Sequence, residues 1–282
     1  MKLLVTGAAG MLGREVVAAA ERLGHEVAAW DLPECDLTDA GATLAAIRRL
    51  EPRAVVNCAA YTNVDAAEAD EATATLVNGD AAGNVARACA AAGARLVHVS
   101  TDYVFDGSKR EPWIESDATS PLGAYGRSKL HGEDLVRAEL PDHAIVRTAW
   151  LFGPHGPNFV STMLRLATER DEVQVVTDQV GSPTFAGHLA PALVDMAERT
   201  DTGIFHGAGA GSCSWYELTL EAYDAAGVAC RVLPTTAEQF ARPAPRPAYS
   251  VLGSEREHPI TLPPWQEGVR AHLSALEEVP SR

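Results

Sequence analysis

The chain has 282 residues, of which 46% are hydrophobic, so it is long enough for an α/β unit with a substantial core. Its 38 acidic residues against 23 lysines and arginines give a formal net charge of −15, which argues against nucleic acid or an anionic membrane as a partner. The five cysteines show no metal or disulfide spacing, and neither a signal peptide nor a long apolar run is present, so a cytoplasmic location is expected.

Short apolar strands alternate with helical stretches through the first half of the chain. Strands are predicted at 3–6, 25–30, 54–57, 95–100 and 145–148, and helices at 12–23, 40–50 and 72–92. The alternation predicts an α/β fold, a Rossmann-type doubly wound parallel sheet with helices on both faces. Strands without polar interruptions are typical of a sheet that is buried on both faces.

The second half is less regular. The segments 174–176 and 203–206 are candidates for further strands of the same sheet. Proline and glycine concentrate from Pro234 to Pro264, so this stretch is either a flexible linker or an ordered loop that closes over a site. We predict a dinucleotide-binding core over 1–150. The remainder, 151–282, is predicted to be mainly a smaller, interleaved substrate lobe, with segments near 173–190 and 203–206 returning to the core.

A glycine motif, GxxGxxG, lies between the first strand and the first helix. Gly7, Gly10 and Gly13 allow a tight turn, and the helix N-terminus offers N–H groups to a pyrophosphate. Asp31, 18 residues after Gly13, can bind the adenosine ribose and would repel a 2′-phosphate. NADH is therefore expected to be used at least as well as NADPH, unless Arg14 neutralises the phosphate.

The motif YxxxK is formed by Tyr125 and Lys129, which share one face of a predicted helix. A nearby cation lowers the pKa of a phenol and makes it usable for proton transfer at neutral pH. Thr101 follows a buried strand in the segment STDYVFDG. Because ligands of doubly wound sheets bind beyond the carboxyl ends of strands, Thr101 and Tyr125 are predicted to meet over a nicotinamide.

Together these elements resemble the extended branch of the short-chain dehydrogenase/reductase superfamily. The motifs RTAWLFG at 147–153, DQVGSPT at 178–184 and RPAYSVL at 246–252 narrow the resemblance to the dTDP-4-dehydrorhamnose reductase family. This resemblance implies that NADH or NADPH reduces the C4 keto group of a dTDP-4-keto-6-deoxysugar, in the simplest case dTDP-4-dehydrorhamnose to dTDP-L-rhamnose. A homodimer is compatible with it.

Three alternatives remain open. The first is a reductase of another dTDP-4-keto-deoxysugar in an antibiotic pathway, and the second is a non-catalytic regulatory subunit of the same fold. The third is an epimerase or dehydratase of the same branch. Asp102 is followed by Tyr103 rather than by a second carboxylate, and this favours simple reduction over dehydration.

The family's roles are carried over to the matching positions. The catalytic group would be Thr101, Tyr125 and Lys129, and the substrate would contact Thr101, Asp102 and Trp150. Trp150 could instead be a core tryptophan, and Asn78 could be a buried helix group that supports Lys129. No spacing predicts a metal site. The cofactor would be lined by Gly7, Gly10, Met11, Leu12, Gly13, Asp31, Asp36, Leu37, Ala60, Tyr61, Thr62, Val99, Tyr125 and Lys129.

Overall fold

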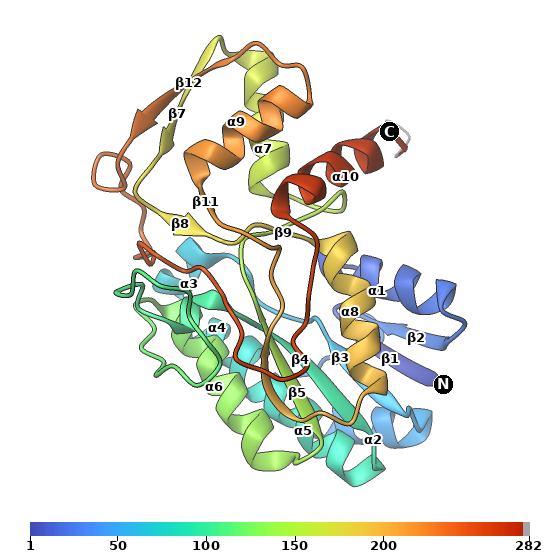
Figure 1. The fold of residues 1–282 in the computed structure, drawn as a ribbon. Coiled ribbons are helices and arrows are strands. Elements are labelled where there is room, and N and C mark those ends of the chain that lie inside the picture. Colours follow the sequence, from blue (N-terminus) through green and yellow to red (C-terminus); the bar gives the residue numbers. More distant parts are fainter. Residues whose placement is uncertain (279–282) are drawn as a thin grey trace.

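The central sheet has six parallel strands in the order β10-β5-β4-β3-β1-β2. The structure is a computed structural model that describes residues 1–278 (Figure 1). The sheet order reverses between β1 and β3, and ligands of such sheets bind in the crevice at that point. The strands are β1 (Lys2–Thr6), β2 (Glu26–Trp30), β3 (Ala54–Asn57), β4 (Arg95–Thr101), β5 (His143–Thr148) and β10 (Gly203–His206).

Helices cover both faces of this sheet, as predicted. Leu3 and Val5 face a cluster built with α1 (Met11–Arg22) and α8 (Ala186–Glu198). Leu4, between them in β1, faces the opposite cluster. Successive side chains of a strand point to opposite faces of the sheet, so a strand of apolar residues contributes to the hydrophobic clusters on both faces. The opposite face is covered by α2 (Ala40–Leu50), α5 (Ala81–Ala92) and α6 (Ala124–Glu139).

The single helix predicted over 72–92 is interrupted. It consists of α4 (Glu71–Thr75), one turn of π-helix, η1 (Leu76–Asp80), and α5. A short helix, α3 (Val64–Ala69), precedes them. π-turns are rare and are frequently found at functional sites. Asn78 and Gly79 are the buried residues of η1, so these two residues of the π-turn face the protein interior.

A smaller lobe, drawn at the top of Figure 1, contains β7 (Glu172–Val176) and β12 (Arg231–Thr235). These two strands pair with each other, so the expectation that 174–176 joins the central sheet was wrong. Val173 and Val175 alternate with exposed residues, because only one face of β7 is covered. The cover comes from α7 (Phe159–Glu169) and α9 (Trp215–Ala225). The expectation for 203–206 is confirmed, since β10 pairs with β5.

The chain passes between the lobes more than once. In Figure 1, α8 lies beside α1 of the sheet layer, and both α8 and β10, which follows it in the chain, come after β7 of the smaller lobe and before its partner β12. The boundary near residue 150 therefore stays a prediction, and residues 279–282 of the predicted lobe lie outside the described residues. Short pairs and a final helix complete the fold: β6 (Leu151–Phe152) with β9 (Thr184–Phe185), β8 (Val180–Gly181) with β11 (Cys213–Ser214), and α10 (Trp265–Glu278).

No helix within residues 1–278 is both long enough and apolar enough to cross a membrane.

Candidate active site

The glycine motif forms a close crossing at the carboxyl end of β1. Gly7 has a φ of +67°, and a Cβ there would lie 2.6 Å from the backbone nitrogen of Ala59. A Cβ on Gly13 would lie 2.1 Å from the carbonyl oxygen of Gly7. Only glycine fits at either position. The first helix begins after Gly10 without a side-chain cap, so its N-terminal N–H groups are available to an anion such as a diphosphate.

Asp31 lies against this loop. One of its carboxylate oxygens accepts a hydrogen bond from the backbone N–H of Ala9 at 2.9 Å, and the other accepts one from Leu32. The Arg14 guanidinium donates to the carbonyl oxygen of Ala9 at 2.9 Å. A carboxylate and a guanidinium thus flank the glycine loop where the adenosine end of a dinucleotide is predicted.

The other residues predicted around the cofactor follow β1, β2 and β3 or lie on β4. Two hydrogen bonds from Thr38 lower the pKa of Asp36, which is exposed, and Leu37 packs against the core. Leu12 is buried in the core, so only its backbone can face a ligand. The remaining predicted positions are partly or fully exposed: Met11, Ala60, Tyr61, Thr62 and Val99. Their contact with a cofactor stays a prediction.

Lys129 is buried one helical turn after Tyr125 on α6. Its ammonium group donates a hydrogen bond to the backbone oxygen of Val99 at 2.8 Å. Burial lowers the pKa of Lys129 to about 8, an effect that Glu133 and Cys58 partly oppose. Lys129 is therefore still mostly protonated at neutral pH.

Burial, together with the smaller effect of the nearby Asp102 carboxylate, raises the pKa of Tyr125 to about 12. The expected lowering of this pKa by Lys129 was wrong for this structure. The ammonium group of Lys129 is engaged by Val99, and desolvation of the phenolate dominates. The phenol is consequently protonated at neutral pH, which is the state required of a proton donor.

The structure places Thr101 near Tyr125, and their meeting over a nicotinamide stays a prediction. Thr101 ends β4 and caps the short 3-10 helix η2 (Asp102–Val104), and its side chain lies near that of Tyr125, where it partly opposes the rise in the Tyr125 pKa. The Thr101 hydroxyl also donates to Asp102 at 3.0 Å. The other carboxylate oxygen of Asp102 is buried without a partner, and burial raises the pKa of Asp102 to about 6. A buried acceptor without a donor calls for one from a ligand or from water.

Asn78 ties the loop after β3 to α6. Its side-chain oxygen accepts from the backbone N–H of Tyr61 at 2.7 Å, and its amide donates to the Tyr61 carbonyl at 3.1 Å and to the Ser128 hydroxyl at 2.9 Å. The expected support of Lys129 is therefore indirect, through its neighbour Ser128. Asn78 lies in the π-turn η1 and from there reaches both the loop after β3 and α6.

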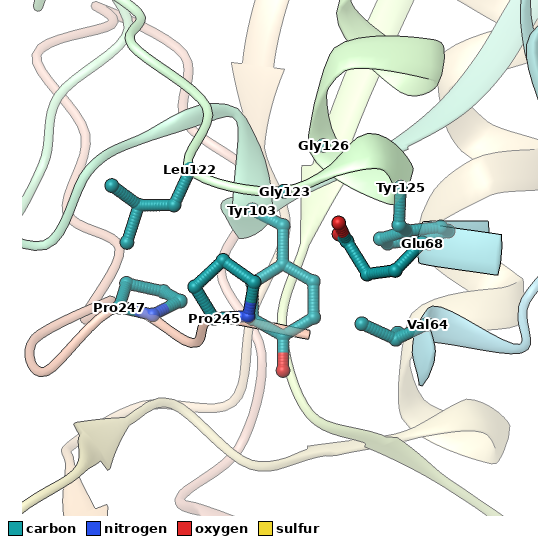
Figure 2. A pocket seen from close by; sticks show the side chains of 9 residues that line it. All are labelled: Val64, Glu68, Tyr103, Leu122, Gly123, Tyr125, Gly126, Pro245 and Pro247. Atoms are coloured by element: carbon teal, nitrogen blue, oxygen red, sulfur yellow. The ribbon is translucent and has the colours of Figure 1, made fainter. Parts of the chain in front are cut away.

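The proline-rich stretch was expected to be either a flexible linker or an ordered loop over a site. In the structure it is a loop that packs beside Tyr103 and Tyr125. Pro245 and Pro247 line a small opening together with Tyr103 and Tyr125, and Figure 2 shows Tyr103 between Pro245 on one side and Glu68 on the other. The opening has room for about one water molecule. We call the segment 240–250 the strap, because it crosses this side of the site.

An ion pair between Arg246 of the strap and Asp65 holds the strap against α3. Asp65 of α3 accepts two hydrogen bonds from the Arg246 guanidinium, at 3.0 and 3.1 Å, and one from the backbone N–H of Ala244. Arg246 also lies near Tyr103, where it partly opposes the rise in the Tyr103 pKa, and Ser250 lies near Asp102 in the same way. Sequence reasoning missed Asp65 and gave Arg246 no role, because nothing in the local pattern pairs residues that lie so far apart along the chain.

Trp150 lies two residues beyond β5, next to the end of β4 that carries Thr101. Its indole is half-buried and stacks on that of Trp215. Contact with a substrate stays a prediction, as does the alternative of a core tryptophan. In the described part of the chain, no group of three His, Cys, Asp or Glu side chains is arranged to hold a metal ion.

A family model described as the RmlD substrate binding domain matches residues 1–278. The chain is 45% identical over 275 residues to a dTDP-4-keto-6-deoxy-D-glucose reductase of Streptomyces niveus, an alignment that covers 97% of this chain and 96% of that protein.

Two solved structures show the same fold. A dTDP-4-dehydrorhamnose reductase from Clostridium acetobutylicum has a TM-score of 0.95 at 40% identity, covering 98% of this chain and 100% of that one. A dTDP-4-dehydrorhamnose reductase from Bacillus anthracis, in complex with NADP, has a TM-score of 0.94 at 35% identity, covering 97% and 99%. These likenesses confirm the Rossmann-type fold predicted from the sequence.

Proposed function

Because this chain belongs to the RmlD substrate-binding domain family, we propose that it is an NAD(P)H-dependent reductase of the C4 keto group of a dTDP-4-keto-6-deoxyhexose. The observation that carries the proposal is the pairing of a protonated, half-buried Tyr125 with Thr101 and a buried Lys129 beside a glycine loop. The simplest substrate is dTDP-4-dehydrorhamnose, which would give dTDP-L-rhamnose. The relative from Streptomyces niveus makes dTDP-4-keto-6-deoxy-D-glucose the second candidate.

The dinucleotide end of the site suits such a cofactor. Gly7 and Gly13 leave no room for side chains, and the first helix of the chain presents its uncapped N-terminus. Asp31 and Arg14 would lie at the adenosine end, and Lys129 would hold the nicotinamide ribose. When bound, the reduced nicotinamide supplies the hydride.

The protein's own residues supply the proton and the orientation. Tyr125 donates its phenolic proton to the C4 oxygen as that oxygen becomes an alkoxide. Thr101, which lies near Tyr125, fixes the position of the same oxygen. The unpartnered oxygen of Asp102 accepts a hydrogen bond from a sugar hydroxyl.

Product analysis tests the reaction. The purified protein, given dTDP-4-dehydrorhamnose or dTDP-4-keto-6-deoxy-D-glucose with NADH or NADPH, should oxidise the cofactor and form one C4 epimer, identified by NMR. The ratio of kcat/KM for the two sugars assigns the substrate. Failure to oxidise either cofactor with either sugar would contradict the proposal. Location in the cytoplasm and assembly into a homodimer remain predictions, and sedimentation analysis addresses the second.

Replacement of Tyr125 by Phe tests its role. Tyr125→Phe removes the transferable proton and keeps the ring, so we expect kcat to fall by about 10²–10⁴-fold. The dissociation constant of the cofactor, measured by fluorescence, should change little. A variant that kept more than about a tenth of the wild-type rate would remove Tyr125 from the role of proton donor.

A further inference from the structure

Trp150 has a strained backbone. Its φ of +45° makes it one of two non-glycine residues with positive φ in residues 1–278, and the other, Glu51, is a helix C-cap. A bulky residue in the left-handed region costs free energy, and such residues persist where their surroundings hold them in place. The neighbours of the Trp150 indole should therefore be the groups that hold it.

The first neighbour is Trp215, the first residue of α9. The two indole rings are parallel to within 3°, with centroids 3.4 Å apart. Aromatic pairs prefer offset or edge-to-face arrangements over full face-to-face overlap, so the surroundings impose this stack. Phe159 backs Trp215 at a centroid distance of 4.4 Å, and Ser214 and Glu217 form a capping box at the start of the helix. Trp215 is thus itself fixed.

The second neighbour is Gly181 of β8. A Cβ at this position would lie 2.4 to 2.8 Å from three atoms of the Trp150 indole, so glycine is required by space. β8 pairs with β11, and Gly181 is the direct partner of Cys213, two residues before Trp215. The two-stranded ribbon of β8 and β11 therefore positions both the Trp215 ring, which stacks on the Trp150 indole, and Gly181, which leaves space for it.

This arrangement stands at the same edge of the sheet as the proton donor. Trp150 follows β5, and Thr148 at the end of that strand is in register with Thr101. We propose that Trp215 and Gly181 are positioning residues that hold the Trp150 indole as a fixed wall for the sugar of the substrate. They would act on sugar-nucleotide binding through Trp150, without touching the hydride or proton. This inference rests on the proposed function and on the predicted contact of Trp150 with the substrate.

A double-mutant cycle tests the inference with a ligand that is not turned over. We would measure the dissociation constant of dTDP-glucose by calorimetry for the wild type, Trp150→Ala, Trp215→Ala and the double variant. Loss of the wall should weaken binding by about tenfold in Trp150→Ala, and by nearly as much in Trp215→Ala. Because Trp215 acts through Trp150, the double variant should bind no more weakly than Trp150→Ala.

Further variants separate positioning from a general loss of structure. Trp215→Phe keeps an aromatic ring in the stack and should bind within about threefold of the wild type. Gly181→Ala pushes the indole aside and should resemble Trp215→Ala. The matched control is Trp265→Phe, in the same hydrophobic cluster, whereas the ring that stacks on Trp150 is that of Trp215; this control should leave binding unchanged. For the proposed substrate, KM should rise in Trp215→Ala and Gly181→Ala while kcat stays within about threefold.

Each outcome decides a different point. If the effects of Trp150→Ala and Trp215→Ala multiply in the double variant, or if Trp265→Phe weakens binding equally, the inference is overturned. Equal binding by all variants would also overturn it and would leave the proposed reaction standing. If the four proteins bind dTDP-glucose as expected but the wild type has no reductase activity, the proposed reaction is wrong and the positioning role stands. A wild type that binds no dTDP-glucose and reduces no dTDP-sugar would overturn both.

Discussion

The Tyr125 phenol and the Asp102 carboxyl lie together in the site, and burial raises the pKa of both. A pKa of about 12 keeps the phenol protonated at neutral pH, whereas a pKa of about 6 leaves the Asp102 carboxyl mostly ionised. Tyr125 therefore holds the proton that reduction consumes, and Asp102 offers an acceptor. The negative charge of Asp102 also opposes ionisation of Tyr125, so the two states reinforce each other.

Asp102 should cost the protein stability at neutral pH. Its pKa rises from 3.8 to about 6 on folding, so the protonated carboxyl favours the folded state. That contribution is present below about pH 4 and is lost as the pH rises to about 6. We expect Asp102→Asn to raise the free energy of unfolding by about 2–3 kcal/mol at about pH 7.5, with a gain that shrinks toward pH 4. Urea unfolding across this range measures it.

The control for this prediction is Asp106→Asn. Asp106 is partly exposed, and hydrogen bonds from Ser108 lower its pKa, so its substitution should bring no gain at neutral pH. An Asp102→Asn variant that is less stable than the wild type at about pH 7.5 would show that the hydrogen bonds of Asp102 outweigh its desolvation.

Asp31 bears on the choice of cofactor. Its carboxylate accepts from the N–H of Ala9 and should also repel a 2′-phosphate on the adenosine ribose. Asp31→Asn keeps an acceptor for Ala9 and removes the charge. We expect kcat/KM for NADPH, relative to NADH, to rise by about five- to tenfold, since repulsion at close range is worth about 1 kcal/mol or more. An unchanged ratio would place the phosphate elsewhere, for instance on Arg14.

At the scale of elements, the π-turn η1 links the loop after β3 to α6. Asn78→Ala would leave the backbone of Tyr61 and the hydroxyl of Ser128 without partners. We expect a loss of about 1–3 kcal/mol in the free energy of unfolding and a lower kcat, because α6 carries Tyr125 and Lys129. Thermal unfolding and steady-state kinetics with both substrates measure the two effects.

Asn84→Ala is the matched control. Asn84 is also buried on this run of helices, but its amide donates to the carbonyls of Leu37 and Thr38, beside the predicted adenosine site. It should cost similar stability and raise the KM of the cofactor, with kcat preserved. Equal effects of the two variants on kcat would assign Asn78 a purely structural role.

The elements also show what sequence can predict. Apolar strands and the glycine turn depend on neighbours in the chain, so the sheet layer and the loop at Gly7 could be predicted. The π-turn could not, because Asn78 is held by Tyr61 and Ser128, 17 and 50 residues away. The same holds for the link between Asp65 and Arg246, which lie 181 residues apart. The pKa of Tyr125 was mispredicted because helical spacing carries no information on desolvation.

At the scale of the whole molecule, the ion pair of Asp65 and Arg246 joins the sheet layer to the strap. Both side chains are about one-fifth to one-quarter exposed, so the pair should add at most about 1 kcal/mol to stability. Its expected effect is on the strap over Tyr125. We predict that Asp65→Asn raises the KM of the sugar nucleotide several-fold, while the melting temperature changes little.

The control here is Glu71→Gln. The pair of Glu71 and Arg127 has similarly short distances, 2.7 and 2.9 Å, but it joins α4 to α6 within the sheet layer and does not include a residue of the strap. Its loss should leave KM unchanged. A KM that rises equally in both variants would indicate a general effect of surface charge rather than a role of the strap.

The route of the chain between the lobes has a consequence for synthesis on the ribosome. In the larger buried cluster of the sheet layer, ten of 21 residues come from positions after 150, among them Leu189, Leu193 and Phe205. A nascent chain that ends near residue 150 therefore exposes one apolar face of its sheet and lacks the edge strand β10. The sheet layer cannot be completed before α8 and β10 emerge, so translation must proceed well into the second half before this half-built layer is protected from aggregation.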